Sequence, residues 1–377
     1  MSVLKRISLP LLALVGTSFA FLPLFDAVVF LVVLGLVPVF IYGVAQFPKS
    51  IRDRIFPLVN FTTVSIALIV FALSLPLWAD AFQLRFFSEM LILGLLAMSL
   101  DVMLGYIGLA SFAHAALAGV SAYMTAIALT HLGWGPWMSI FSALTVGTTV
   151  TTAMGAFSVR VRDIYFGIIT LVFGVVAFII ANSWVSVTNG EDGMTIELPT
   201  LSVFGLFSID TGDFNSFWYL TATVVFVSYL FLRKIMKSSI GLVFHGIREN
   251  EERARYIGYN VNAFKILNTA ISGFFTSIAG VLLILKNGII GTEQMDVIHS
   301  GEVVIWSVIG GLGTLIGPFI GASFVYYLTD YLSEFTERYV LIIGLIFIVT
   351  ILLAPRGLVG TIKEAWQTAP DQKEDQS

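Results

Sequence analysis

The sequence predicts an all-α polytopic membrane protein, with about 10–12 transmembrane helices, some of them broken or re-entrant, and with both termini in the cytoplasm. Of its 377 residues, 57% are hydrophobic and only 12% are charged, and the mean hydropathy is +0.93. Soluble domains carry about 25% charged residues, so a soluble fold of this length could not cover its surface with polar groups. The apolar stretches continue for about 20 residues, which is typical of spanning helices and not of barrel strands.

Segments long and apolar enough to span a bilayer follow one another along the chain. They lie near residues 7–25, 26–46, 58–78, 87–106, 107–130, 134–158, 163–185, 214–233, 266–286, 301–331 and 338–355. Lys and Arg gather around 5–6, 49–54, 160–162 and 233–265, whereas loop 186–213 holds five acidic residues and no Lys or Arg. Because cytoplasmic loops are rich in Lys and Arg, the basic loops are expected in the cytoplasm and loop 186–213 on the outer side.

One of these segments is expected not to form a single, complete crossing of the membrane. Eleven single crossings would place Arg356 and Lys363 outside, against the same charge rule. The segment 301–331 contains GGLGTLIGPFIGA (310–322), with five glycines and Pro318. Relative to Ala, Gly costs about 1 kcal/mol and Pro about 3 kcal/mol inside a helix. The segment is therefore expected to be broken or re-entrant.

A second glycine-punctuated segment, GYIGLASFAHAALAGVSAY (105–123), lies in the first half of the chain. Two interrupted segments in corresponding halves are typical of a transport route between internal repeats, because non-helical backbone at membrane depth must border protein or water. The alternative is that the small residues only let helices pack closely.

The stretch GLVFHGIRENEERARYIGYN (241–260) concentrates charge in an otherwise apolar chain. Glu249 and Glu251 each stand four residues before an arginine, in the favourable order for a helix, and Gly258 is a natural C-terminal stop. The spacing predicts a short polar helix over 248–257 in the cytoplasm. A helix this short is marginal alone, so it is expected to lie against a neighbour; a solvated loop helix is the alternative.

Five motifs, in order within residues 87–360, resemble those of permease subunits of branched-chain amino acid ABC importers. They are GYIGLASFAHAALAGVSAY (105–123), TNGEDG (188–193), GIRENEERARYIGYN (246–260), GGLGTLIGPFIGA (310–322) and PRGL (355–358). The positions in register with the family's first motif are Gly105, Tyr106, Gly108, Ser111 and His114. Leu109, Ala113 and Leu242 stand where the family commonly has Gln, Gly and Arg. The first two lie in the expected pathway, so the exact substrate is left open.

Residues 1–57 are predicted to be an N-terminal extension with two transmembrane helices, and residues 361–377 a cytoplasmic polar tail. The resemblance is silent on the extension and implies a permease domain over 58–360. It implies a translocation pathway lined by Tyr106, Gly108, Ser111, Ala113, His114, Gly310, Gly311, Gly313 and Pro318. It implies a coupling helix that docks on an ATPase through Arg248, Glu249, Asn250, Glu251, Arg253, Ala254 and Gly258. In the acidic outer loop, Asn189, Glu191 and Asp192 are expected to receive a binding protein, with a solvated loop as the alternative.

No Gly-x-x-x-x-Gly-Lys-Ser/Thr motif occurs, so ATP hydrolysis is expected on a partner chain. The chain is interpreted as a non-enzymatic, binding-protein-dependent permease for branched-chain or related amino acids in the inner (plasma) membrane, without cofactor or metal. The implied partners are a second permease subunit in a heterodimer, two ATPase subunits, a periplasmic or extracellular binding protein and membrane lipid, with no nucleic acid. The alternatives are a permease for urea or short amides, an ion-coupled secondary transporter and a membrane-embedded enzyme.

Three polar residues have two interpretations each. His114 either belongs to the pathway or makes a structural hydrogen bond that fixes the broken helix. Asp101 either caps or neutralises a neighbour or contacts a ligand. Glu302 either favours a helix N-terminus or gates the pathway.

Overall fold

The computed structural model describes residues 74–161, 163–203, 207–335, 340, 343–344, 347–348 and 357–360. All of them belong to one compact unit, Val64–Thr361. The N-terminal extension 1–57, the polar tail 361–377 and the location of both termini fall outside the described residues and stay predictions.

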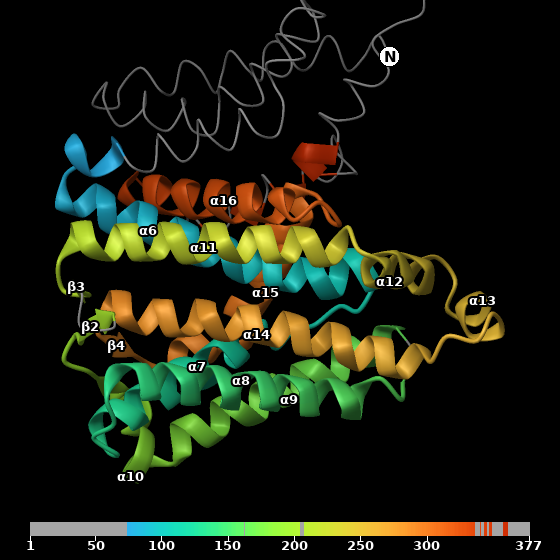
Figure 1. Cartoon of the computed structure of the whole chain (residues 1–377), viewed down its shortest axis with the longest axis horizontal. Coiled ribbons are helices and arrows are strands. Elements are labelled where there is room, and N and C mark those ends of the chain that lie inside the picture. The colour runs from blue at the N-terminus through green and yellow to red at the C-terminus, as the bar shows by residue number, and fades with distance from the viewer. Residues whose placement is uncertain are drawn as a thin grey trace, which may run out of the picture. The chain divides into compact units, whose positions relative to one another are not determined.

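The described part is mostly helical, as predicted from the sequence (Figure 1). Its α-helices are α6 (Ala81–Asp101), α7 (His114–Thr130), α8 (Pro136–Ser158), α9 (Asp163–Ser183), α10 (Val185–Thr188), α11 (Phe214–Met236), α12 (Ser239–Glu249), α13 (Glu251–Tyr256), α14 (Val261–Asn287), α15 (Val297–Gly310) and α16 (Ile316–Phe335). Shorter turns are η3 (Leu75–Leu77), the π-helical η4 (Val102–Ile107), η5 (Gly190–Asp192) and η6 (Thr292–Met295).

Five helical stretches within the described ranges are long and apolar enough to cross a membrane. They are Ala81–Ile107, Pro136–Ser158, Tyr165–Ser183, Phe214–Met236 and Val261–Asn287. Two shorter apolar helices, α7 and α15, accompany them. The chain is therefore a multi-pass membrane protein, in agreement with its composition.

Short antiparallel strands lie at one end of the helices. β1 (Met194–Thr195) pairs with β4 (Ile289–Ile290), and β2 (Thr200–Val203) pairs with β3 (Phe207–Asp210). We call this the strand end; α12 and α13 lie at the opposite end, which we call the α13 end (Figure 1). The acidic loop and the basic stretch of the sequence therefore lie at opposite ends of the spanning helices.

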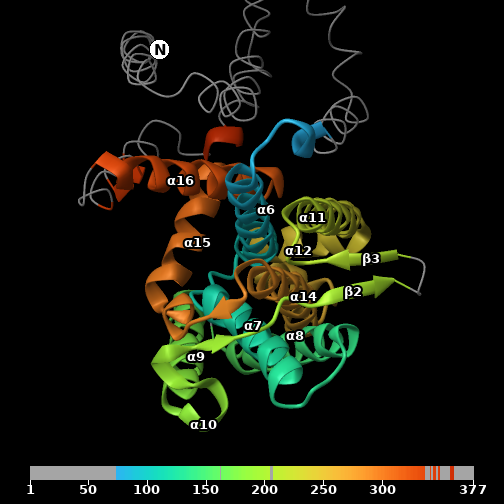
Figure 2. The ribbon, with the colours of Figure 1, turned by 90° about the vertical axis from the view of Figure 1, so that its left-hand side faces the viewer.

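Helix α14 is the centre of the bundle, packed against α6, α7 and α8 (Figure 2). The contact with α7 is close because Gly280 has no side chain: a Cβ there would lie 2.1 Å from the carbonyl oxygen of Ala118. Small residues let helices approach closely in membranes, where apolar burial between helices gives little driving force. The alternative of close packing through small residues is thus realised at this contact.

Both predicted interruptions are present. Helix α6 continues into η4, which ends at Gly108 with φ 85°, and α7 begins only at His114. Helix α15 ends at Gly310 and α16 begins at Ile316. The residues between them form a turn in which Gly311, Gly313 and Leu315 have positive φ.

The predicted helix over 248–257 is instead two helices. Asn250 has an extended backbone, ends α12 at Glu249 and begins α13 at Glu251. Its side-chain Oδ1 accepts a hydrogen bond of 2.8 Å from the backbone N–H of Arg253, so it is an N-cap. Among the described residues no ion pair joins Glu249 to Arg253, because the two residues lie on different helices.

Candidate functional site

The first interruption carries five of the predicted pathway residues. Ser111, Ala113 and His114 are fully buried and Tyr106 is nearly so. Gly108 is exposed and faces Arg248 of α12. The structure therefore separates Gly108 from the buried positions that follow it.

His114 begins α7 and is fixed to α14. Its Nε2 lies 3.0 Å from Ser272 Oγ, and that hydroxyl donates to the carbonyl oxygen of Ser99 at 2.6 Å. Because the single hydroxyl proton is used there, His114 Nε2 carries a proton and donates to Ser272 Oγ. The structural hydrogen bond considered for this residue is present, and Nδ1 is left as a buried acceptor without a partner among the described residues.

The second interruption is fastened by Asp101, a residue whose side chain is fully buried. One carboxylate oxygen, Oδ1, accepts from the backbone N–H of Gly313 at 2.7 Å, and Oδ2 accepts from that of Leu315 at 2.9 Å. The capping interpretation of Asp101 is thus confirmed. The partners were missed from the sequence, although a carboxylate inside an apolar span already indicated that one must exist.

The two interruptions lie side by side. A Cβ on Gly105 would lie 2.4 Å from the backbone nitrogen of Gly313, and the N–H of Ala115 donates to Ser300 Oγ at 3.2 Å. Helices α15 and α16 also touch through backbone, because a Cβ on Gly310 would lie 1.8 Å from the carbonyl oxygen of Gly317. The predicted pathway residues of both halves, including buried Pro318, therefore belong to one region.

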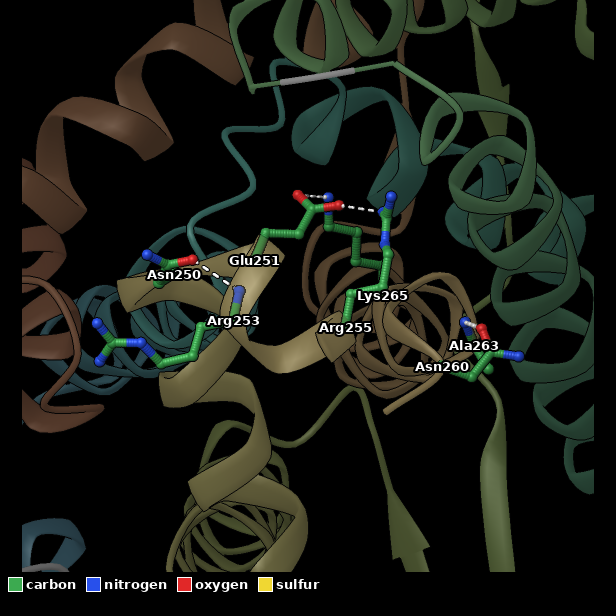
Figure 3. A network of polar contacts seen from close by, with 7 residues as sticks. All are labelled: Asn250, Glu251, Arg253, Arg255, Asn260, Ala263 and Lys265. Carbon is green, nitrogen blue, oxygen red and sulfur yellow. Dashed lines mark hydrogen bonds and ion pairs between the residues drawn. The ribbon is translucent and has the colours of Figure 1, made fainter. Parts of the chain in front are cut away.

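The predicted coupling residues gather at the α13 end (Figure 3). Glu251 is bonded twice: Oε1 lies 2.9 Å from Arg255 Nη2, and Oε2 lies 2.7 Å from Nζ of Lys265 on α14. Ala254 is the buried residue of α13, and Gly258 takes a φ of 98°, as expected of a C-terminal stop. The helix lies against α14, as its short length requires.

Residues that the sequence reasoning did not single out complete this end. The side chains of Tyr256 and Ile257 are 87% and 69% exposed, although both are large and apolar. His245 of α12 contacts the ring of Tyr106, with centroids 5.0 Å apart. Burial and, after it, the nearby charge of Arg248 lower the pKa of His245, so the ring is neutral at pH 7.

A cavity of about 430 Å³ opens at the strand end. It is lined by Phe178, Asn182, Glu191, Asp192, Ile289, Gly291, Thr292, Glu293, Gln294 and Asp296. Two of the three predicted docking residues, Glu191 and Asp192, are among them, whereas Asn189 is not. The residues from 289–296 were missed, because nothing in the sequence shows that they face loop 186–213. Glu302 pairs with His299 at 2.9 Å in the first turns of α15.

Comparison with known proteins connects this arrangement to one family. The family described as branched-chain amino acid transport system / permease component matches residues 83–352. High-affinity branched-chain amino acid transport system permease protein LivM of Salmonella typhimurium is 24% identical over 330 residues, which cover 81% of this chain and 77% of that protein. The protein of the same name from Escherichia coli is 25% identical over 330 residues, with the same coverage.

A second group of relatives matches a shorter part of the chain. Autoinducer 2 import system permease protein LsrC of Yersinia enterocolitica is 25% identical over 215 residues, 55% of this chain and 56% of that protein. No solved structure gives a significant match. The match over 83–352 covers well over half of the chain and includes both interruptions and the α13 end. The chain belongs to the branched-chain amino acid transport permease family and is a non-catalytic, multi-pass permease component of an ABC transporter.

Proposed function

We propose that the chain is the permease subunit of a binding-protein-dependent ABC importer in the inner (plasma) membrane. In this proposal it translocates branched-chain or related amino acids, and a separate ATPase subunit supplies the energy. The observation that carries the proposal is α13, a short helix anchored to α14 that presents apolar and charged side chains beyond the ends of the spanning helices.

Helix α13 supports an ATPase contact through its exposed surface. Tyr256 and Ile257 are large apolar side chains that an isolated protein gains nothing by exposing, and the exposed Arg253 and Arg255 precede them in the chain. Buried aromatic anchors with charges around them are typical of protein interfaces, where the apolar part gives affinity and the charges give register. Because the ion pair of Glu251 with Lys265 ties α13 to α14, a displacement of the helix reaches the centre of the bundle.

The two adjacent interruptions support a pathway for an amino acid. Helix α7 starts inside the bundle, so the partial positive charge at its N-terminus suits a carboxylate. His114 Nδ1, a buried acceptor without a described partner, suits an ammonium group at the same place. A zwitterion offers both charges, whereas urea offers neither, so the site favours an amino acid over urea or short amides.

The strand end supports docking of a substrate-binding protein. The cavity there is bordered by Glu191, Asp192, Glu293 and Asp296. Such a concentration of negative charge would guide a partner with a basic surface. A heterodimer with a second permease subunit, two ATPase subunits and surrounding lipid complete the proposed assembly.

Reconstitution tests the proposal and its alternatives together. The chain would be placed in proteoliposomes with a candidate ATPase, second permease and binding protein, and uptake of labelled leucine, valine, urea and acetamide would be measured. Uptake of leucine or valine that requires both ATP and binding protein is the expected result. ATP-dependent uptake of urea or acetamide alone would assign the substrate to the alternative class.

The ion-coupled alternative has its own signature in this assay. A transporter of that kind needs a titratable carboxylate in the spans. Glu89 of α6 is held in an ion pair with Lys286 of α14, and Asp101 is held by two backbone N–H groups. Uptake driven by a proton or sodium gradient in the absence of ATP would show that the ABC proposal is wrong.

A further inference from the structure

Arg248, in the last turn of α12, connects the α13 end to the interior of the bundle. Its Nη1 donates a hydrogen bond to the carbonyl oxygen of Gly105 in the π-helical turn η4. Its stem passes Gly108, where a Cβ would lie 3.2 Å from Arg248 Cγ. Arg248 is exposed as a residue, yet its guanidinium lies on the backbone of buried Gly105.

Gly105 brings three separate segments into contact. A Cβ at this position would lie 1.9 Å from Asp101 Oδ1 and 2.4 Å from the backbone nitrogen of Gly313, so only glycine fits. A Cβ on Gly313 would in turn lie 3.2 Å from the carbonyl oxygen of Gly105 and 3.4 Å from Arg248 Nη1. The guanidinium, the Asp101 carboxylate and the turn between α15 and α16 thus share one small region.

The turn between α15 and α16 depends on Asp101. Leu315 has a φ of 60°, a left-handed conformation that is unfavourable for a residue with a branched side chain, and its N–H is bonded to Asp101 Oδ2. Gly313 takes a φ of 78° and donates to Oδ1. Gly313 adopts its positive φ readily, but Leu315 does not, so the bond to Asp101 Oδ2 holds Leu315 in a conformation that leucine itself disfavours.

We infer that Asp101 is a positioning residue that links the position of α12 to the conformation of the turn between α15 and α16. The inference rests on the proposed function, in which the ATPase moves α13 and α12. When α12 moves, Arg248 pulls on the carbonyl of Gly105, one turn of helix from Asp101, and the carboxylate carries this displacement to Gly313 and Leu315. A purely structural cap would hold the turn equally well wherever α12 lies.

The first test uses D101N in the reconstituted complex. The amide keeps the shape of the carboxylate but replaces one acceptor oxygen by a donor, which faces a backbone N–H. The complex is expected to assemble and to hydrolyse ATP at the parental basal rate. Stimulation of ATP hydrolysis by substrate-loaded binding protein and uptake should both fall about tenfold, a size typical of coupling between sites. Parental stimulation in D101N would overturn the inference.

A double-mutant cycle separates a linked pair from two independent defects. R248Q removes the guanidinium that donates to Gly105. In D101N/R248Q, stimulation of ATP hydrolysis by the binding protein should be no lower than in the more impaired of the two single variants, because both changes interrupt one connection. R253Q is the matched control, since Arg253 lies on α13 and Figure 3 shows its side chain directed away from Lys265. In D101N/R253Q, the fold-losses of stimulation of the two single variants should multiply. Multiplying losses in D101N/R248Q would overturn the inference.

A labelling experiment tests the turn directly, including the case in which D101N does not assemble. The chain has no cysteine, so L312C is a single reporter within the turn. In the otherwise parental complex, its rate of maleimide labelling should change when the ATPase is trapped with nucleotide, and R248Q should abolish that change. A change that persists in R248Q would overturn the inference. A parental complex without binding-protein stimulation would overturn the proposed function itself, whatever the variants do.

Discussion

Lys265 shows how a single buried charge organises the α13 end. Its side chain is 3% exposed, and its Nζ lies 2.7 Å from Glu251 Oε2. A buried ammonium that loses its partner keeps the cost of leaving water, whereas an exposed arginine does not. Glu251 therefore contributes more through its long-range partner than through the i,i+4 pair with Arg255, which the sequence predicts and the structure confirms.

Glu251→Gln and Arg255→Gln should differ in their effect on stability. The first leaves Lys265 buried with a neutral partner and should lower the free energy of unfolding by about 1–3 kcal/mol. The second removes one partner of a pair whose arginine is 60% exposed, and its effect should stay below about 0.5 kcal/mol. Thermal unfolding of both variants in detergent measures this. Equal midpoints would show that Lys265 does not depend on Glu251.

At the scale of helices, the sequence predicts those boundaries that depend on the residues at the boundary itself. The interruptions at 108–113 and 311–315 could be predicted because their glycines disfavour a helix, and because Pro318 is tolerated only near a helix start, as in the first turn of α16. The division of 248–257 was missed because the i,i+4 pairs, worth a few tenths of a kcal/mol, were weighed without the Asn250 cap, worth about 1 kcal/mol. The bond from Asp101 to Leu315 could not be predicted, since it joins residues 214 positions apart.

The α7–α14 contact predicts opposite effects for two glycine substitutions. Gly280→Ala should destabilise by about 1–3 kcal/mol, because its Cβ would lie 2.1 Å from a backbone oxygen and the helices must separate. Gly301→Ala, inside α15 with nothing within 4 Å of the new Cβ, should stabilise by about 0.5–1 kcal/mol through helix propensity. Melting temperatures of the two purified variants test the contact. A stabilised Gly280→Ala would mean that α7 and α14 lie further apart.

For the whole molecule, the distribution of charge and the arrangement of the helices agree. Helix α11 has 23 residues. At 1.5 Å per residue it is about 35 Å long, enough to cross a bilayer core of about 30 Å. It begins after the acidic loop at the strand end and ends at the basic stretch of the α13 end. The start of α8 is also fixed at the strand end, because Trp137 Nε1 donates to the carbonyl oxygen of Ser202 in β2 at 2.6 Å.

The ends of the molecule should therefore face opposite compartments, with the α13 end in the cytoplasm. Single cysteines at Ser208 in β3 and Leu132 before α8, both exposed at the strand end, should react with a membrane-impermeant maleimide added outside intact cells. A cysteine at exposed Ser239, the first residue of α12, should react only in inverted vesicles. Parental chain without cysteine is the background control. Labelling of Ser239 from outside would reverse the orientation and move α13 away from the compartment that holds ATP, and the coupling proposal would then be wrong.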